Sequence, residues 1–257
     1  MARKKGTKAP TILRKAPLTR VPVYNPLELA NLGDGIKRAI EACAPLPLEH
    51  LTEFEGAGLY LLYPTGSTKP YPEYRSIEEA NCYGRFEKPI YVGKAMRSAT
   101  RIGLLPVSKP TTAIYTRLNN HRNSIKAASS TLDIEDFYFR YLPLEEAFIA
   151  LGESHLISAY RPVWNRHVWG FGSNATGAPR EAGKCSRWDT THPGRSGVGK
   201  KPNAKSAEEI LEIIRKFVAG DEVEEAAEEI AEAELEESAA AIEGLAEASP
   251  SPLADQD

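Results

Sequence analysis

Apolar residues follow two different spacings along the chain. Short runs of aromatic and branched residues at 58–63, 89–92 and 137–142 are bounded by Gly or Pro, which is typical of buried strands. Longer stretches at 111–128 and 144–160 repeat apolar residues every three or four positions, which predicts helices with one apolar face. The middle of the chain therefore has the predicted order β-β-α-β-α.

One further helix is predicted on each side of this central region. In residues 25–50, Asn25-Pro26 has the form of a helix start, and apolar residues recur at helical spacing to about residue 44. We expect this helix to pack on the core or on a second subunit. In residues 206–220, Ser206 and Glu209 form a capping box, and Gly220 suits the helix end.

The remaining segments are distinguished by their composition. Residues 1–24 hold seven Lys or Arg and no acid, so we expect a disordered basic arm. Residues 64–88 are rich in Pro, Gly and Tyr, and residues 166–205 are rich in Gly, Lys and Arg, so the latter are expected to be mostly loops. Residues 221–257 form an acidic tail with fourteen Asp or Glu and no Lys or Arg.

The charge of the chain is unevenly distributed. The formal net charge is −3, from 32 Lys or Arg and 35 Asp or Glu. Because fourteen acids lie in the tail, residues 1–220 carry 32 bases against 21 acids, a net charge of +11. Such a body favours a polyanionic partner, although the same charges could simply solvate the surface. The tail would either compete with that partner or aid solubility.

Cysteine usage and hydropathy exclude several classes of protein. Three cysteines without a CxxC pair, namely Cys43, Cys82 and Cys185, suit neither a disulfide framework nor a zinc site. No apolar run approaches the ~20 residues of a membrane span, and the basic N-terminus lacks the apolar region of a secretory signal. We therefore expect a cytoplasmic protein with reduced thiols and no membrane partner, with an organellar transit peptide as the alternative for the N-terminus.

Several polar residues lie where a core is expected. Glu153 is one helical turn from both Ile149 and Ile157, and burying a carboxylate without a partner costs a few kcal/mol or more. His121 lies on the apolar face of the 111–128 helix, with Arg117 one turn before it. Taken alone, His121 is more often a hydrogen-bonded core histidine, and Arg117 a surface arginine.

The strands and helices carry a recognisable set of motifs. Gly58-Leu59-Tyr60 and Tyr91-Val92-Gly93 resemble the two halves of the signature of the GIY-YIG nuclease family. Arg117 and Glu153 follow on the expected helices. The addition of His121 and Asn165 resembles the type II restriction-endonuclease branch, whose members cut GC-rich palindromes. The resemblance covers roughly residues 50–200, continuing through Gly170-Phe171-Gly172 and the stretch from Trp188 to Arg195.

This resemblance implies an α+β fold. The expected structure is a small GIY-YIG domain with a three-stranded antiparallel sheet flanked by helices, plus N- and C-terminal helical extensions. The nuclease domain would span residues 51–205. Within it, residues 64–88 would form an inserted hairpin, because compact family members have a much shorter connection, and residues 166–205 would form DNA-contacting loops.

The resemblance also implies a role for each motif residue. Glu153 would bind one Mg²⁺ ion, for which Mn²⁺ could substitute, and the ion would polarise the phosphate and stabilise the leaving oxygen. Arg117 would bind the phosphate, Tyr91 would position the water or the phosphate, and Asn165 would orient Tyr60 or the phosphate. Tyr60 would be the general base. Because a phenol has a pKa near ~10, it would need help from a cation or from His121, and Lys94 is a competing candidate.

Double-stranded DNA is the expected partner. Cutting both strands of a palindrome calls for two active sites, so we expect a homodimer, and a cognate DNA methyltransferase in the host that is not a stable partner. The candidate DNA contacts are all basic: Lys94, Arg75, Arg85, Arg180, Arg187 and Arg195. The alternatives are a repair or homing nuclease of the same fold, a catalytically silent DNA-binding protein, and a structural α/β protein.

Overall fold

The computed structural model describes residues 28–66, 71–97, 110–172 and 183–221. Its centre is a four-stranded antiparallel sheet with the order β1-β4-β2-β3. The three predicted strands are confirmed, and a two-residue strand is added at one edge. The strands are β1 (Leu46–Pro47), β2 (Gly58–Pro64), β3 (Tyr91–Ala95) and β4 (Phe137–Pro143).

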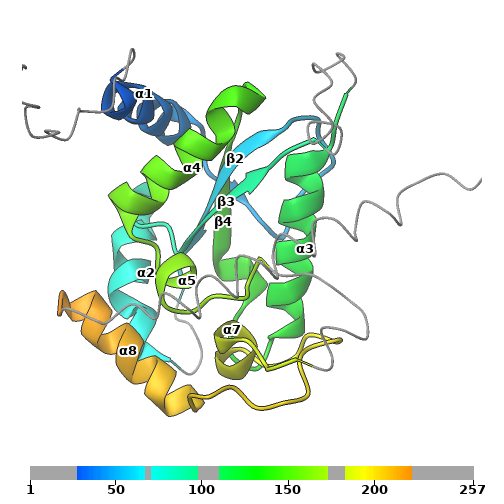
Figure 1. Cartoon of the computed structure of the whole chain (residues 1–257), viewed down its shortest axis with the longest axis vertical. Coiled ribbons are helices and arrows are strands. Elements are labelled where there is room, and N and C mark those ends of the chain that lie inside the picture. The colour runs from blue at the N-terminus through cyan, green and yellow to red at the C-terminus, as the bar shows by residue number, and fades with distance from the viewer. Residues whose placement is uncertain (1–27, 67–70, 98–109, 173–182, 222–257) are drawn as a thin grey trace, which may run out of the picture.

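Helices cover both faces of the sheet, which explains why every residue of β2 is buried. Leu59, Leu61 and Tyr63 pack with α1 (Leu29–Ala42) and α4 (Glu146–Tyr160) on one face. Tyr60 and Leu62 pack with α3 (Ala113–Ala127) on the other. Figure 1 shows α3 and α4 on opposite sides of the strands. The alternation of side chains along a strand thus distributes one apolar run between two cores.

The N-terminal helix α1 packs on the core of the same chain, chiefly against α4. Gly33 lies against the ring of His155, where an added Cβ would come within 2.3 Å of that ring. His155 Nε2 lies 3.0 Å from Asp34 Oδ1, and the Tyr160 hydroxyl donates to Glu41 over 2.7 Å. The predicted helix start at Asn25-Pro26 lies outside the described residues, and the helix begins at Leu29 after Glu28.

The insertion between β2 and β3 is helical, so the predicted hairpin at residues 64–88 is wrong. It contains η1 (Pro72–Tyr74), α2 (Arg75–Asn81) and η2 (Cys82–Gly84). The buried Asn81 side chain closes it, because its amide donates to the carbonyls of Pro64 and Lys88 and accepts from the Lys88 N–H, all over 2.9 Å. Non-local hydrogen bonds of this kind leave no periodic trace in the sequence.

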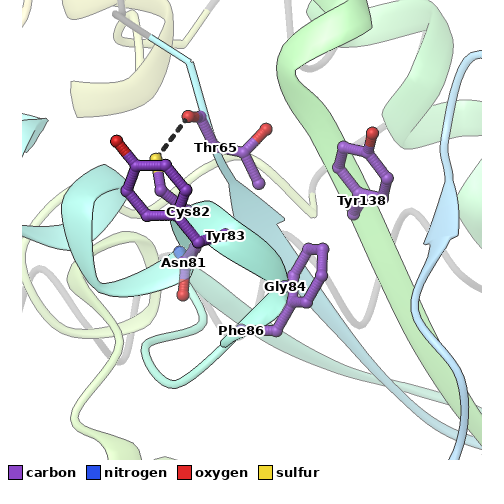
Figure 2. Close-up of a pocket in the computed structure, with 7 residues that line it drawn as sticks. All are labelled: Thr65, Asn81, Cys82, Tyr83, Gly84, Phe86 and Tyr138. Atoms are coloured by element: carbon purple, nitrogen blue, oxygen red, sulfur yellow. Dashed lines mark hydrogen bonds between the residues drawn. The ribbon is translucent and has the colours of Figure 1, made fainter.

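A pocket of about 370 Å³ lies beside this insertion, at the Pro64 end of β2. Figure 2 shows its lining, in which the Cys82 thiol donates to the Thr65 carbonyl. Tyr83 is fully exposed and has a φ of 58°. The residues that line the pocket include none of the predicted catalytic residues, so it is not the expected active site.

The prediction of mostly loops in residues 166–205 is confirmed for the described part of this stretch, where α7 (Arg187–Thr191) is a short helix. The aromatic side chains of Phe171 and Trp188 are nevertheless buried. The capping box of Ser206 and Glu209 is confirmed at the start of α8 (Ala207–Ala219), as is Gly220 at its end, with a φ of 92°. The basic arm of residues 1–24 and the acidic tail beyond Asp221 lie outside the described residues.

The described residues include no helix that is both long and apolar enough to cross a membrane. None of the three cysteines, each partly exposed, forms a disulfide.

A buried polar network ties the insertion to the rest of the domain. His192 is fully buried, with Nε2 3.1 Å from the Tyr74 hydroxyl and Nδ1 2.9 Å from the Thr131 hydroxyl. The Trp164 indole N–H also donates to Tyr74 over 3.2 Å. Burial lowers the pKa of His192 from 6.5 to about 3 and raises that of Tyr74. The network is therefore built from neutral groups.

The buried His192 should make stability pH-dependent. Its pKa is lower in the folded state, so the unfolded chain takes up the proton first as the pH falls below 6.5. Linkage then predicts a loss of about 2 kcal/mol of unfolding free energy from this group between pH 7.5 and 5. His192→Gln should reduce the pH dependence by about that amount in urea denaturation.

Thr131→Val is the matched control, because it removes the same hydrogen bond without removing a titrating group. It should lower the stability by a similar amount at both pH values. If the His192→Gln protein lost as much stability as the wild type over this pH range, His192 would not be the titrating group.

Candidate active site

Three of the predicted catalytic residues meet on the α3 face of the sheet. Tyr60 from β2, Tyr91 from β3 and His121 from α3 are all buried. The Tyr60 hydroxyl lies 2.8 Å from His121 Nε2, and the rings of Tyr91 and His121 meet edge to face at 5.2 Å. The strand ladder and one helix thus bring together residues that are 61 positions apart in the chain.

The two glycines of the tripeptides are required by close backbone approaches. The β2–β3 register places Tyr60 opposite Gly93, where an added Cβ would lie 2.3 Å from the Tyr60 hydroxyl oxygen. Gly58 has a φ of 154°, and an added Cβ there would lie 2.1 Å from the Leu142 carbonyl oxygen. The first contact lets the Tyr60 ring cross β3, and the second lets β2 approach β4.

His121 is held as a neutral imidazole. Its pKa lies well below 6.5, first because it is buried and then because Arg117 and Arg195 are nearby cations. Its Nδ1 atom is buried and has no hydrogen-bond partner among the described residues. Nε2 can therefore accept a proton from the Tyr60 hydroxyl, but a free phenol is a much weaker acid than the imidazolium that would form, so the transfer is uphill. Tyr60 thus needs a further cation to become a base.

Phe171 completes this cluster and was not assigned a role from the sequence. Its ring is fully buried and stacks on His121 with centroids 4.3 Å apart. It also contacts the ring of Tyr91 at 5.1 Å. The tripeptide Gly170-Phe171-Gly172 was part of the family resemblance, and that was the only signal that could have found it.

Glu153 and Lys94 form an ion pair on the opposite, α4 face of β3. The Lys94 ammonium donates to Glu153 Oε2 over 2.6 Å, and their side chains are 44% and 19% exposed. Lys94 is the partner that an acid on an apolar helix face required. Since β3 is an edge strand, the buried tyrosines and the partly exposed ion pair lie on the two faces of one edge of the sheet.

Arg117 and Asn165 are placed differently from one another. Arg117 is partly exposed on α3, and its guanidinium donates to the Gly172 carbonyl over 3.3 Å. Asn165 lies in α5 (Val163–Arg166), where its amide accepts from the Val92 N–H over 2.8 Å and donates to the Val92 carbonyl over 2.9 Å. We expected Asn165 to orient Tyr60 or the phosphate, but its hydrogen bonds instead fix the strand that carries Tyr91 and Lys94.

The predicted DNA contacts separate into exposed and buried residues. Arg75 and Arg85 are exposed on the insertion. Arg195 is only 8% exposed, pairs with Asp189 through two nitrogens at 2.7 and 2.8 Å, and lies over Trp188. Arg187 is also buried, over the ring of Trp169. In this arrangement neither buried arginine can read DNA, and Arg180 lies outside the described residues.

The donor set of the site suits a hydrated divalent ion. Across the described segments, no group of three or more His, Cys, Asp or Glu side chains is arranged to hold a metal. Glu153 offers a single carboxylate that already binds a cation, Lys94. Mg²⁺ is usually held by one or two carboxylates together with waters and substrate phosphates, so Glu153 fits such an ion. When bound, the ion would polarise a phosphate and stabilise a leaving oxygen.

Comparison with known families decides the identity of the domain. The family model described as the Eco29kI GIY-YIG domain matches residues 52–218. The chain belongs to this family. It is a type II restriction-endonuclease family of GIY-YIG nucleases, so the chain is a restriction endonuclease-like nuclease and DNA is its partner.

The match begins before β2 and ends within α8, so α1 lies outside it. No protein with a curated description matches the chain.

Gly93 gives a test of the Tyr60 packing. Gly93→Ala should destabilise the protein by about 1–3 kcal/mol through overpacking and should abolish DNA cleavage, because the new methyl group displaces the Tyr60 ring. Urea denaturation and a cleavage assay measure the two effects.

Gly35→Ala is the matched control within α1, where an added Cβ meets nothing within 4 Å. It should stabilise the helix by about 0.5–1 kcal/mol and leave cleavage unchanged. A Gly93→Ala protein with wild-type stability and activity would contradict the contact with Tyr60.

Proposed function

We propose that this protein is a Mg²⁺-dependent type II restriction endonuclease, able to use Mn²⁺, that hydrolyses double-stranded DNA at a GC-rich palindrome, with CCGCGG as the first candidate. The observation that carries the proposal is the arrangement around β3. A tyrosine–histidine hydrogen bond lies on one face of this edge strand, and a carboxylate able to hold a cation lies on the other. A phosphodiester at the open edge would be within reach of both.

Each residue has a role that follows from its position. Arg117 would bind the phosphate and compensate its charge. Tyr60 would take a proton from the attacking water and pass its own hydroxyl proton to Nε2 of the neutral His121. Glu153 would hold the single divalent ion, and Tyr91 would position the water or the phosphate. Asn165 would act indirectly, by fixing the backbone of β3 through Val92.

The charge of Arg117 also couples His121 to the substrate. Arg117 is one of the two cations that lower the pKa of His121. A phosphate bound at Arg117 would offset that contribution and make His121 a better proton acceptor. Burial is the larger cause and would persist, so the substrate would restore only part of the basicity.

A double-strand cut would determine the oligomeric state of the enzyme on DNA. Two equivalent cuts in a palindrome call for two active sites related by a two-fold axis, so a homodimer is expected on the DNA. A host that contains this enzyme would need a methyltransferase of the same specificity. That methyltransferase would act on DNA separately and would not form a stable complex with the enzyme.

A digest of unmethylated phage DNA tests this function. The wild type should give discrete bands in Mg²⁺ or Mn²⁺ and none in EDTA, and sequencing the ends would give the site. Tyr60→Phe should lower the rate at least ~100-fold, the usual size of a general-base contribution, and Glu153→Ala should lower it at least as much. Both variants should keep the wild-type circular dichroism spectrum.

Glu212→Ala is the control, because this partly exposed acid lies on α8 and pairs with Arg215. It should cleave as the wild type does. A smear instead of bands would indicate a repair or other non-specific nuclease. Binding of duplex without any cleavage would indicate a silent DNA-binding protein. Cleavage that persists in Glu153→Ala would refute the assignment of the metal to this residue.

A further inference from the structure

The carboxylate proposed to hold the metal is already bound to a cation of the protein itself. The Lys94 ammonium lies 2.6 Å from Glu153 Oε2. An ammonium at this distance neutralises the charge and occupies a lone pair of the carboxylate, which are the two features that a divalent ion would use. Lys94 and the ion would therefore compete for the same oxygen.

The position of Lys94 suits exchange. Its side chain is 44% exposed, whereas that of Glu153 is 19% exposed, so the ammonium can move into water while the carboxylate stays in place. A lysine carries a compact charge on a flexible four-carbon chain, and its ammonium is well solvated once released. The backbone of Lys94 is held in the β2–β3 ladder opposite Leu59, so release would not require β3 to move.

The packing of α4 does not depend on this ion pair. A second ion pair links the segment after β3 to α4, because Arg97 lies 3.6 Å from Glu146 in the first turn of α4. Glu146 and Glu153 are two helical turns apart, about 10.5 Å along the axis. Ile149 and Leu156 also bury the helix against the sheet. Lys94 can thus leave Glu153 while α4 remains in position.

We propose that Lys94 is a built-in competitor of the catalytic metal, which neutralises Glu153 in the metal-free enzyme and lowers its affinity for divalent ions. The inference rests on the proposed function, since it assumes that Glu153 is the metal ligand. It assigns Lys94 a positioning role that is separate from proton transfer and from contact with DNA. Removing the ammonium should therefore raise the affinity of Glu153 for divalent ions.

Binding of Mn²⁺ to the full-length protein without DNA tests this inference. Paramagnetic broadening of the Gly152 and Glu153 amide signals reports on ions bound close to Glu153. Lys94→Met, which keeps the length of the side chain without its charge, should lower the Mn²⁺ concentration at half-broadening about fivefold. This is the order expected for one partly exposed ion pair.

Three further variants test whether the charge of Lys94, the neighbouring ion pair or the Glu153 carboxylate determines the Mn²⁺ midpoint. Lys94→Arg keeps a cation and should have a midpoint near that of the wild type. Arg97→Met removes the neighbouring ion pair with Glu146 and should leave the midpoint unchanged. Glu153→Gln in the Lys94→Met background should abolish the specific broadening.

The outcomes distinguish this inference from the proposed function. Broadening at Glu153 with the same or a higher Mn²⁺ midpoint in Lys94→Met would overturn the competition and leave the metal site intact. No specific broadening in any variant would overturn both, because Glu153 would then not bind the ion.

Discussion

The edge position of β3 is the constraint on which the site depends. An edge strand has one row of backbone groups without a neighbouring strand, and these groups must be satisfied or exposed to water. At Val92 the amide of Asn165 supplies both a donor and an acceptor. One residue earlier in α5, the backbone N–H of Trp164 donates to the Ile90 carbonyl over 3.0 Å. A short helix, through one side chain and one backbone group, thus takes the place of a fifth strand.

This solution fixes β3 in place while the side chain of Lys94 stays exposed. Val92 is flanked by Tyr91 and Gly93, and Lys94 follows with an exposed side chain. A full neighbouring strand would have covered these residues. The amide covers one position of this edge, with the buried Tyr60–His121 pair on one face of the sheet and the partly exposed Lys94–Glu153 ion pair on the other. The geometry of the proposed active site therefore follows from how the sheet ends.

The sequence was informative wherever the determining interactions were local. The aromatic runs predicted β2, β3 and β4, and the capping box of Ser206 predicted the start of α8, because strand patterning and capping involve residues close in the chain. The cluster of Tyr60, Tyr91 and His121 was also predicted, though only through the family resemblance. The motif encodes a fold in which these residues meet, and their spacing alone does not.

What the sequence could not predict depends on distant partners. Arg195 was expected to contact DNA, but the nearby Asp189 and the ring of Trp188 bury it. An arginine in a glycine-rich stretch has the same local sequence pattern whether it contacts DNA or is buried in the fold. The insertion was expected to be a hairpin, but Asn81 closes a helical segment onto the backbone of Pro64 and Lys88. Such residues show their roles only when the fold supplies their partners.

The electrostatics of the site are consistent with an anionic substrate. Arg117 and Arg195 both lower the pKa of His121, so two positive charges lie near the imidazole before any substrate arrives. Arg195 is neutralised in part by Asp189, whereas Arg117 hydrogen-bonds the Gly172 carbonyl and remains partly exposed. Of these two cations, Arg117 is therefore the one placed to exchange its contact for a phosphate. The same charge that makes His121 a weak base at rest thus attracts the group whose hydrolysis requires it.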